Sequence, residues 1–273
     1  MEALLLDLAL GAYLIATLAA GVTLLQPNLK ATRLGVLALV AGFMLGSVVL
    51  LVRSLRLGAL VLSGGVEQVA LFSWLVVGIY LVVQLRSRLA ALAGLVGPIG
   101  FIGALAALGS SEQPVDVPEL LRSPWLPVHI TLAVVGDAAF ALAGLVSAIY
   151  LWQERQLKAR ATGKALARLP SLETLDRLSF RLLAWGFLTL TLSIMAGALW
   201  AELTHGRMLN WEPRTIWTVV VWLVYALLLH GRASVGWGGR RAARLTIVGF
   251  CLLAVSLVGV RLLAPGSHSG AYG

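Results

Sequence analysis

Histidine and tryptophan side chains are the residues of this sequence whose chemistry and placement stand out. His129, His230 and His268 each lie at the end of an apolar run, and a fourth histidine, His205, lies in the stretch Trp200–Trp217, WAELTHGRMLNWEPRTIW. Neutral imidazole nitrogens coordinate metal ions, and the three indole rings of this stretch suit a flat aromatic ligand. The stretch also fits an interfacial loop, because tryptophan is enriched where a membrane meets water. Both interpretations stay open on these residues alone.

The elements that must position these residues are membrane-spanning helices. The chain has 273 residues, of which 59% are hydrophobic and 12% charged, with a mean hydropathy of +0.92, whereas soluble proteins have about 45–50% apolar and 25% charged residues. A helix needs about 20 apolar residues to cross a bilayer. We therefore predict an all-α integral membrane protein, a bundle of about eight transmembrane helices forming one domain over residues 1–273. The windows are roughly Leu8–Leu25, Leu34–Val52, Val69–Leu85, Leu89–Leu108, Pro127–Trp152, Leu182–Trp200, Ile216–His230 and Leu245–Leu263.

The distribution of lysine and arginine predicts the orientation. Fifteen of the 21 basic residues fall in the first, third, fifth and seventh connections, and basic residues are enriched on the cytoplasmic side. Both termini are then outside, and the net charge of +9 indicates topology rather than nucleic-acid binding. Glu2 and Asp7 argue against a cleaved signal peptide. We expect a multi-pass protein of a bacterial-type inner (cytoplasmic) membrane, with the lipid bilayer as a partner.

In this orientation His129, the Trp200–Trp217 stretch and His268 lie on the same, outer side. Two imidazoles beside a shelf of tryptophans are what a bis-histidine haem site needs. Arg207 and Arg214 suit the haem propionates, since a guanidinium binds a carboxylate through two hydrogen bonds. The alternative for each histidine is a solvated interfacial side chain. Cys251 is the only cysteine, so no Cys-x-x-Cys-His motif is present and the chain does not bind haem covalently.

An ordered set of motifs resembles the cytochrome c assembly membrane-protein family, the CcsA, CcmC and HemX group of haem-handling proteins. The stretch WAELTHGRMLNWEPRTIW occupies the position of the family's tryptophan-rich loop, whose usual form is close to WANEAWGxYWxWDPKExW, without a gap. The resemblance extends over about 230 residues. Its other segments are GFMLGSVVLLVR (42–53), VEQVALFSW (66–74), SPWLPVHI (123–130), LPSLETLDRLSFRLLAWGF (169–187), WTVVVWLVYALLLH (217–230), GWGGRRAA (236–243) and SHSGAY (267–272).

The resemblance implies that the chain presents haem on the outer face of the membrane. His129 and His268 would be the axial ligands of a non-covalently bound haem b, and His230 matches one of the paired intramembrane histidines of the larger synthases. Family members deliver haem, or attach it to apocytochrome c. Because this chain has no large extracytoplasmic domain, a membrane partner subunit that binds apocytochrome c is expected. The residues expected to hold the macrocycle are Trp200, Arg207, Trp211, Glu212, Arg214 and Trp217.

Departures from the family pattern leave two classes of function. His205 and Leu209 replace tryptophans of the loop, and Thr215 replaces its last acidic residue. The partner of His230 is expected near Gly46, which has no side chain to ligate iron. The first class is a haem delivery protein or a haem-lyase (synthase) subunit, which the retained histidines favour. The second is a HemX-like regulator of haem synthesis or a structural subunit of a larger complex, which the altered loop favours. Ligase activity is left open.

Overall fold

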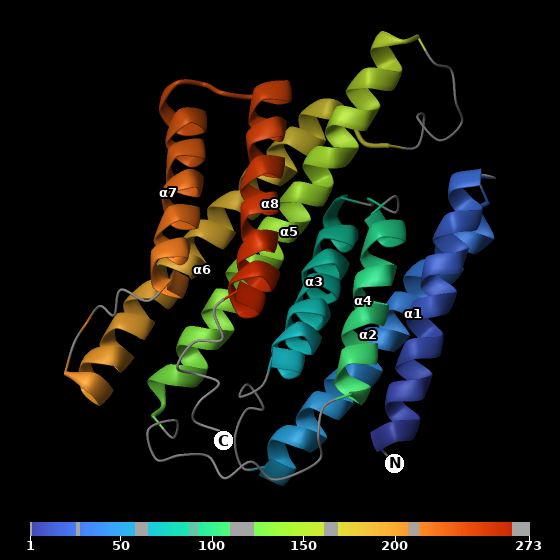
Figure 1. Ribbon diagram of the computed structural model, residues 1–273. Coiled ribbons are helices and arrows are strands. Elements are labelled where there is room, and N and C mark those ends of the chain that lie inside the picture. The colour runs from blue at the N-terminus through green and yellow to red at the C-terminus, as the bar shows by residue number, and fades with distance from the viewer. Residues whose placement is uncertain are drawn as a thin grey trace. The chain divides into compact units, whose positions relative to one another are not determined.

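Helices are the only regular secondary structure in the part of the chain that the structure describes. The structure is a computed structural model, and each of its eight helices overlaps one of the eight predicted apolar windows (Figure 1). The predicted all-α class is therefore confirmed. The described residues are 2–25, 28–57, 65–87, 89, 92–109, 123–160, 169–206, 208 and 213–263.

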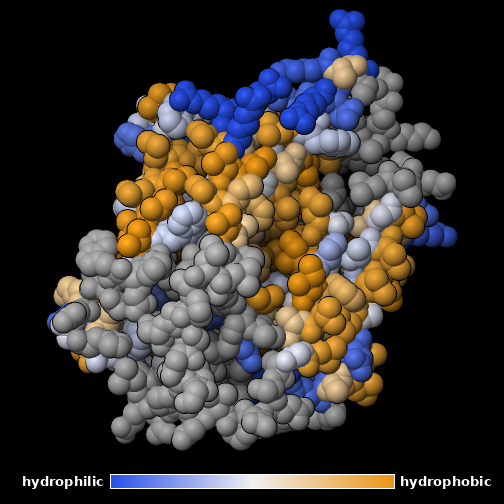
Figure 2. Space-filling view, viewed as in Figure 1, coloured by the Kyte–Doolittle hydropathy of each residue, from blue (hydrophilic) through white to orange (hydrophobic). Residues whose placement is uncertain are grey.

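Six of these helices are long and apolar enough to cross a membrane, so the chain is a multi-pass membrane protein. α4 (Ala93–Leu108) is equally apolar but has only 16 residues. Large apolar side chains such as Leu37, Trp185 and Leu227 are more than 60% exposed; such surfaces are stable against lipid rather than water. Figure 2 shows this apolar surface on the sides of the helices, with hydrophilic side chains where α8 begins. The number of spans and the side of the termini remain predictions.

The helices form two compact units. Unit 1 comprises Met1–Pro114 and Gln153–Ser171, and unit 2 comprises Val115–Trp152 and Leu172–Gly273. The boundary falls inside the long helix α5 (Trp125–Lys158), whose last residues belong to unit 1. Each unit is therefore assembled from segments that are not adjacent in sequence.

Unit 1 is built on α1 (Glu2–Leu25), which packs against α2 (Leu29–Leu57) and α4, while α3 (Gly65–Ser87) packs against α4. Glycines allow these close crossings: a Cβ atom on Gly42 or Gly100 would lie 2.7 Å from the ring of Tyr13. Arg53 of α2 pairs with Glu2 of α1 and donates a hydrogen bond to the backbone oxygen of Ala107, at 3.0 Å. The pairing joins three helices at one end of the unit.

Unit 2 contains α6 (Leu172–His205), α7 (Pro213–Ser234) and α8 (Gly239–Leu263) together with α5 up to Trp152. The ring of Phe140 on α5 stacks on that of Tyr225 on α7, with centroids 3.7 Å apart. Gly136 and Gly186 let α5 and α6 approach, since a Cβ on Gly136 would lie 3.1 Å from the Gly186 oxygen. This packing fixes α5, α6 and α7, which carry His129, Trp200 and Trp217.

Two helix ends differ from the predicted windows. The fifth window was predicted to begin at Pro127, but α5 begins at Trp125 and includes Pro127 in its first turn. Proline is tolerated there because the first N–H groups of a helix have no intrahelical acceptor. The Trp200–Trp217 stretch was expected to be a loop, yet α6 continues to His205 and α7 begins at Pro213. Gly206, with φ 65°, follows α6, and proline suits the first position of a helix.

Candidate functional site

His129 lies in the first turns of α5 and is held by α6. Its Nδ1 atom is 2.7 Å from the backbone oxygen of Ser193 and 3.1 Å from the Ser193 hydroxyl. The same hydroxyl donates to the backbone oxygen of His129, at 2.9 Å. His129 is half-buried, whereas Ser193 is almost fully buried. The imidazole is thus fixed against α6 rather than moving in solvent.

Trp200 lies on the face of α6 that contacts His129. Ser193, Gly197 and Trp200 follow each other at spacings of four and three residues, which places them on one stripe of a helix. A Cβ on Gly197 would lie 2.7 Å from the His129 ring, so the stripe passes directly beneath the imidazole. Trp200 is half-buried one turn further along. Measured along the axis of α6, Trp200 is therefore about 5 Å from Gly197, the residue beneath the His129 ring.

Trp217 lies in the second turn of α7, at the same end of unit 2. Its indole N–H donates to the backbone oxygen of Leu252 on α8, at 3.2 Å, so this tryptophan fastens α7 to α8. The ring is half-buried and keeps part of its surface exposed. The structure shows Trp217 in a packing role between α7 and α8. Its role in binding a ligand stays a prediction.

The remaining predicted shelf residues fall mainly outside the described residues. Arg207, Trp211, Glu212 and His268 are among them, so their placement stays a prediction. The backbone of Arg214 is in the first turn of α7, but its side chain is outside the description, as is the side chain of His205. The described part of the site consequently rests on His129, Trp200 and Trp217.

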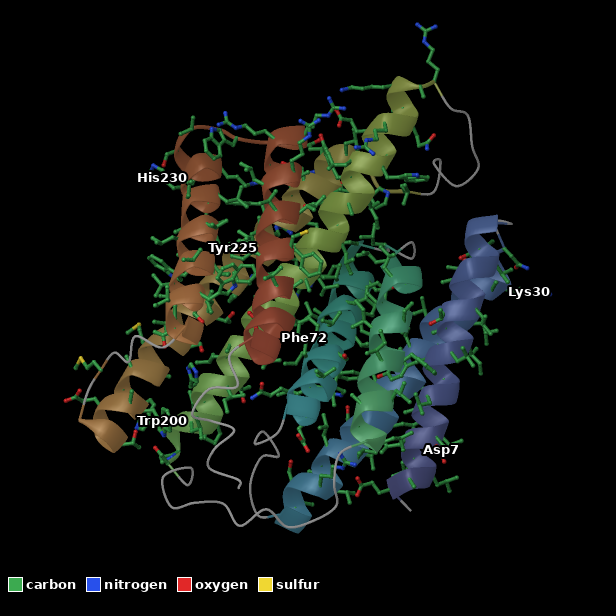
Figure 3. All side chains as sticks on the ribbon, viewed as in Figure 1. Asp7, Lys30, Phe72, Trp200, Tyr225 and His230 are labelled. Carbon is green, nitrogen blue, oxygen red and sulfur yellow. The ribbon has the colours of Figure 1, made fainter. Side chains whose placement is uncertain are left out.

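His230 lies at the other end of α7, where it is exposed and 3.5 Å from the Ser234 hydroxyl. Thirteen residues separate it from Trp217, about 20 Å along a helix, and Figure 3 shows His230 and Trp200 at opposite ends of unit 2. His230 and Trp200 could therefore not bind the same haem. Gly46, where the partner of His230 was expected, lines a cavity of about 50 Å³ in unit 1 with Tyr13 and Trp74.

The donor set fits haem better than a bare metal ion. Among the described residues no group of three or more His, Cys, Asp or Glu side chains is placed to hold an ion. Haem iron needs fewer protein ligands, because the porphyrin supplies four nitrogens and the protein only the axial ones. The imidazole of His129 on α5 and the indole of Trp200 on α6 are the described groups at this end that could contact a porphyrin. His268, predicted as the second axial ligand, lies outside the described residues.

Ser193 and Gly197 were missed by the sequence analysis. They interrupt the apolar window Leu182–Trp200 at a four-residue spacing, and a small polar residue and a glycine on one helical face indicate a close contact. That signal was available in the sequence. It did not reveal which element makes the contact, because His129 is 64 residues away.

Comparisons with known proteins identify the family of the chain. The profile of the family described as Cytochrome C assembly protein matches residues 91–268. A Cytochrome c biogenesis protein CcsA of Synechococcus sp. (strain CC9902) is 39% identical over 170 residues, covering 55% of this chain and 56% of that protein. The protein of the same name from Parasynechococcus marenigrum (strain WH8102) is 37% identical over 170 residues, with the same coverage. The matched region thus spans little more than half the length of these relatives.

A solved structure shares the fold of the whole chain. Cytochrome c Heme Lyase CcmF superposes on 99% of this chain with a TM-score of 0.60, using 50% of its own length. The sequence identity is 18%. At this identity the similarity concerns the fold alone.

Proposed function

Because the chain belongs to the cytochrome c assembly protein family, we propose that it acts in cytochrome c maturation by binding haem at the end of unit 2 that carries His129. The observation that carries the proposal is that the imidazole of His129 is fixed against the same stripe of α6 that contains Trp200. We place this end on the outer face of a bacterial inner membrane. The basic residues of the opposite end, among them Arg181, Arg240 and Arg244, support this orientation.

The chain's own residues bind and orient the haem. His129 and His268 are the proposed axial ligands, and Trp200, Trp211 and Trp217 the indoles that pack against the macrocycle. Arg207 and Arg214 are proposed to bind the propionates, with Glu212 beside them. His230 is the candidate ligand of a separate site at the opposite end. The whole chain, residues 1–273, is proposed to act as one assembly domain.

A haem held in one orientation by these residues would present its vinyl groups to an incoming apocytochrome. Each thioether forms when a cysteine S–H adds across a vinyl double bond, so no leaving group is released. The contribution required of this chain is to position the haem. The reaction between its vinyl groups and the cysteines of the apocytochrome then becomes effectively intramolecular. A partner subunit that binds apocytochrome c completes the proposed system.

The absorption spectrum of the detergent-purified protein, with pyridine haemochrome analysis after expression with ample haem, tests the proposal. We expect nearly one b-type haem per chain, lost in His129→Ala and in His268→Ala. His230→Ala separates the two proposed sites: because this histidine lies at the opposite end of unit 2, the variant should keep the haem bound at the His129 end. A wild-type protein without haem would overturn the proposal and favour the regulatory or structural role.

A further inference from the structure

We infer that Ser193 and Gly197 of α6 are positioning residues that hold His129 with Nε2 as its iron-binding nitrogen. The inference deepens the proposed function and rests on it, because it assumes that His129 ligates haem iron. According to this inference, two residues of α6 determine the orientation of the His129 ring on α5 and which of its nitrogens carries the proton.

The proton of the imidazole is fixed by its hydrogen-bond partners. A backbone carbonyl only accepts hydrogen bonds, so the 2.7 Å contact between Nδ1 and the Ser193 oxygen requires the hydrogen to be on Nδ1. The Ser193 hydroxyl gives its single hydrogen to the His129 backbone oxygen at 2.9 Å. At 3.1 Å from Nδ1 this hydroxyl oxygen therefore acts as a second acceptor. Both contacts require the same tautomer.

In this tautomer the lone pair of the neutral ring is on Nε2. A metal ion binds the nitrogen that carries the lone pair, and the tautomer is set by the hydrogen bond of the other nitrogen. Metal-ligating histidines generally donate that other N–H to a carbonyl, a carboxylate or water, which orients the ring and raises its basicity. The Ser193 carbonyl has this position relative to His129. The ligand would thus be oriented before haem arrives.

Gly197 provides the space in which the ring lies. A Cβ atom at this position would be 2.7 Å from both Cε1 and Nδ1 of His129, closer than such atoms approach. Glycine inside a helix is less favourable than alanine, so a glycine at this position has a packing reason. Because the obstructing atoms belong to the end of a side chain, an added methyl group would displace the ring rather than the backbone.

The experiment compares wild type, Gly197→Ala and Ser193→Ala, with Gly11→Ala as a matched control, since a Cβ on Gly11 meets nothing within 4 Å. The first readout is the ¹⁵N spectrum of histidine-labelled apoprotein at a pH where imidazole is neutral, assigned with His129→Gln. The second is haem affinity by titration. We expect the Nδ1–H tautomer in wild type and in the control. Gly197→Ala should lose this signature and about 10- to 100-fold in haem affinity, and Ser193→Ala should lose less, because the carbonyl remains.

The outcomes separate the inference from the proposed function. Haem bound to wild type whose His129 carries its proton on Nε2 would overturn the inference alone. Wild-type haem affinity in Gly197→Ala would also overturn it. If Gly197→Ala does not fold, the wild-type tautomer and the Ser193→Ala titration still decide. No haem on wild type would overturn the proposed function, and with it the role of both residues.

Discussion

Arg232 of α7 donates hydrogen bonds to both the backbone oxygen and the carboxylate of Asp176 on α6, at 3.1 and 2.9 Å. The other carboxylate oxygen of Asp176 accepts from the backbone N–H of Gly239, the first residue of α8, at 3.2 Å. The Arg232 guanidinium also lies over the ring of Phe180, 5.1 Å from its centroid. This pair therefore connects three helices at the end of unit 2 opposite His129.

Arg232→Ala is expected to destabilise the protein by about 3 kcal/mol, because removing one member of a buried ion pair leaves the other without its counter-charge. The side chain of Arg232 is 6% exposed and that of Asp176 25%. Thermal unfolding in detergent, followed by tryptophan fluorescence, measures the effect. Arg177→Ala is the control on α6, since the Arg177–Glu173 pair is exposed and 3.5 Å apart; such pairs contribute little. Equal effects of the two variants would contradict the assignment.

Tyr225 is expected to tolerate loss of its hydroxyl but not of its ring. The residue is fully buried, and its hydroxyl has no hydrogen-bond partner among the described residues. Tyr225→Phe should leave stability unchanged or raise it by up to about 1 kcal/mol. Tyr225→Ala should cost about 3 kcal/mol, because it removes the stack on Phe140 and opens a cavity. A marked loss of stability in Tyr225→Phe would reveal a partner of the hydroxyl.

Gly103→Ala is expected to destabilise the crossing of α3 and α4 in unit 1. A Cβ on Gly103 would lie 2.2 Å from the Cβ of Ser73, and overpacking of this kind costs about 2 kcal/mol. Gly11→Ala in α1 should instead stabilise by up to about 1 kcal/mol through helix propensity. Both variants add one methyl group inside a helix of unit 1, and thermal unfolding compares a methyl group that meets another side chain with one that does not. Similar unfolding temperatures would refute the described α3–α4 contact.

Trp217 and Trp200 are expected to respond differently to substitution. Trp217→Phe removes the N–H that bonds to Leu252 and should lower the stability of the apoprotein by about 1 kcal/mol, with haem content retained. Trp200→Ala should lower haem content more than Trp217→Phe does, because Trp200 lies on the stripe of α6 that contacts His129. Haem stoichiometry and thermal unfolding are measured on the same preparations. The reverse order would contradict the roles given to the two residues.

Hydropathy was sufficient to predict the helices because each apolar window had to satisfy its backbone inside a membrane. The ends were predicted less well, since Trp125 and His205 lie in polar or proline-containing segments that hydropathy assigns to connections. The windows also predicted that His129 and Trp200 lie at the end of unit 2 opposite Arg232, and they do; which of the two ends faces outward stays a prediction. The contact of His129 with Ser193 was not predictable, because it depends on how α5 packs against α6. The hydropathy pattern of neither helix alone contains that information.

The hydrogen bond between His129 and Ser193 also sets an order of events during synthesis. His129 leaves the ribosome on α5, but the carbonyl that accepts its proton belongs to a residue made 64 positions later. A nascent chain that stops before α6 carries the histidine without its acceptor. The oriented imidazole therefore forms only when α6 has been inserted beside α5, so the haem binding proposed at this position would have to follow the insertion of α6.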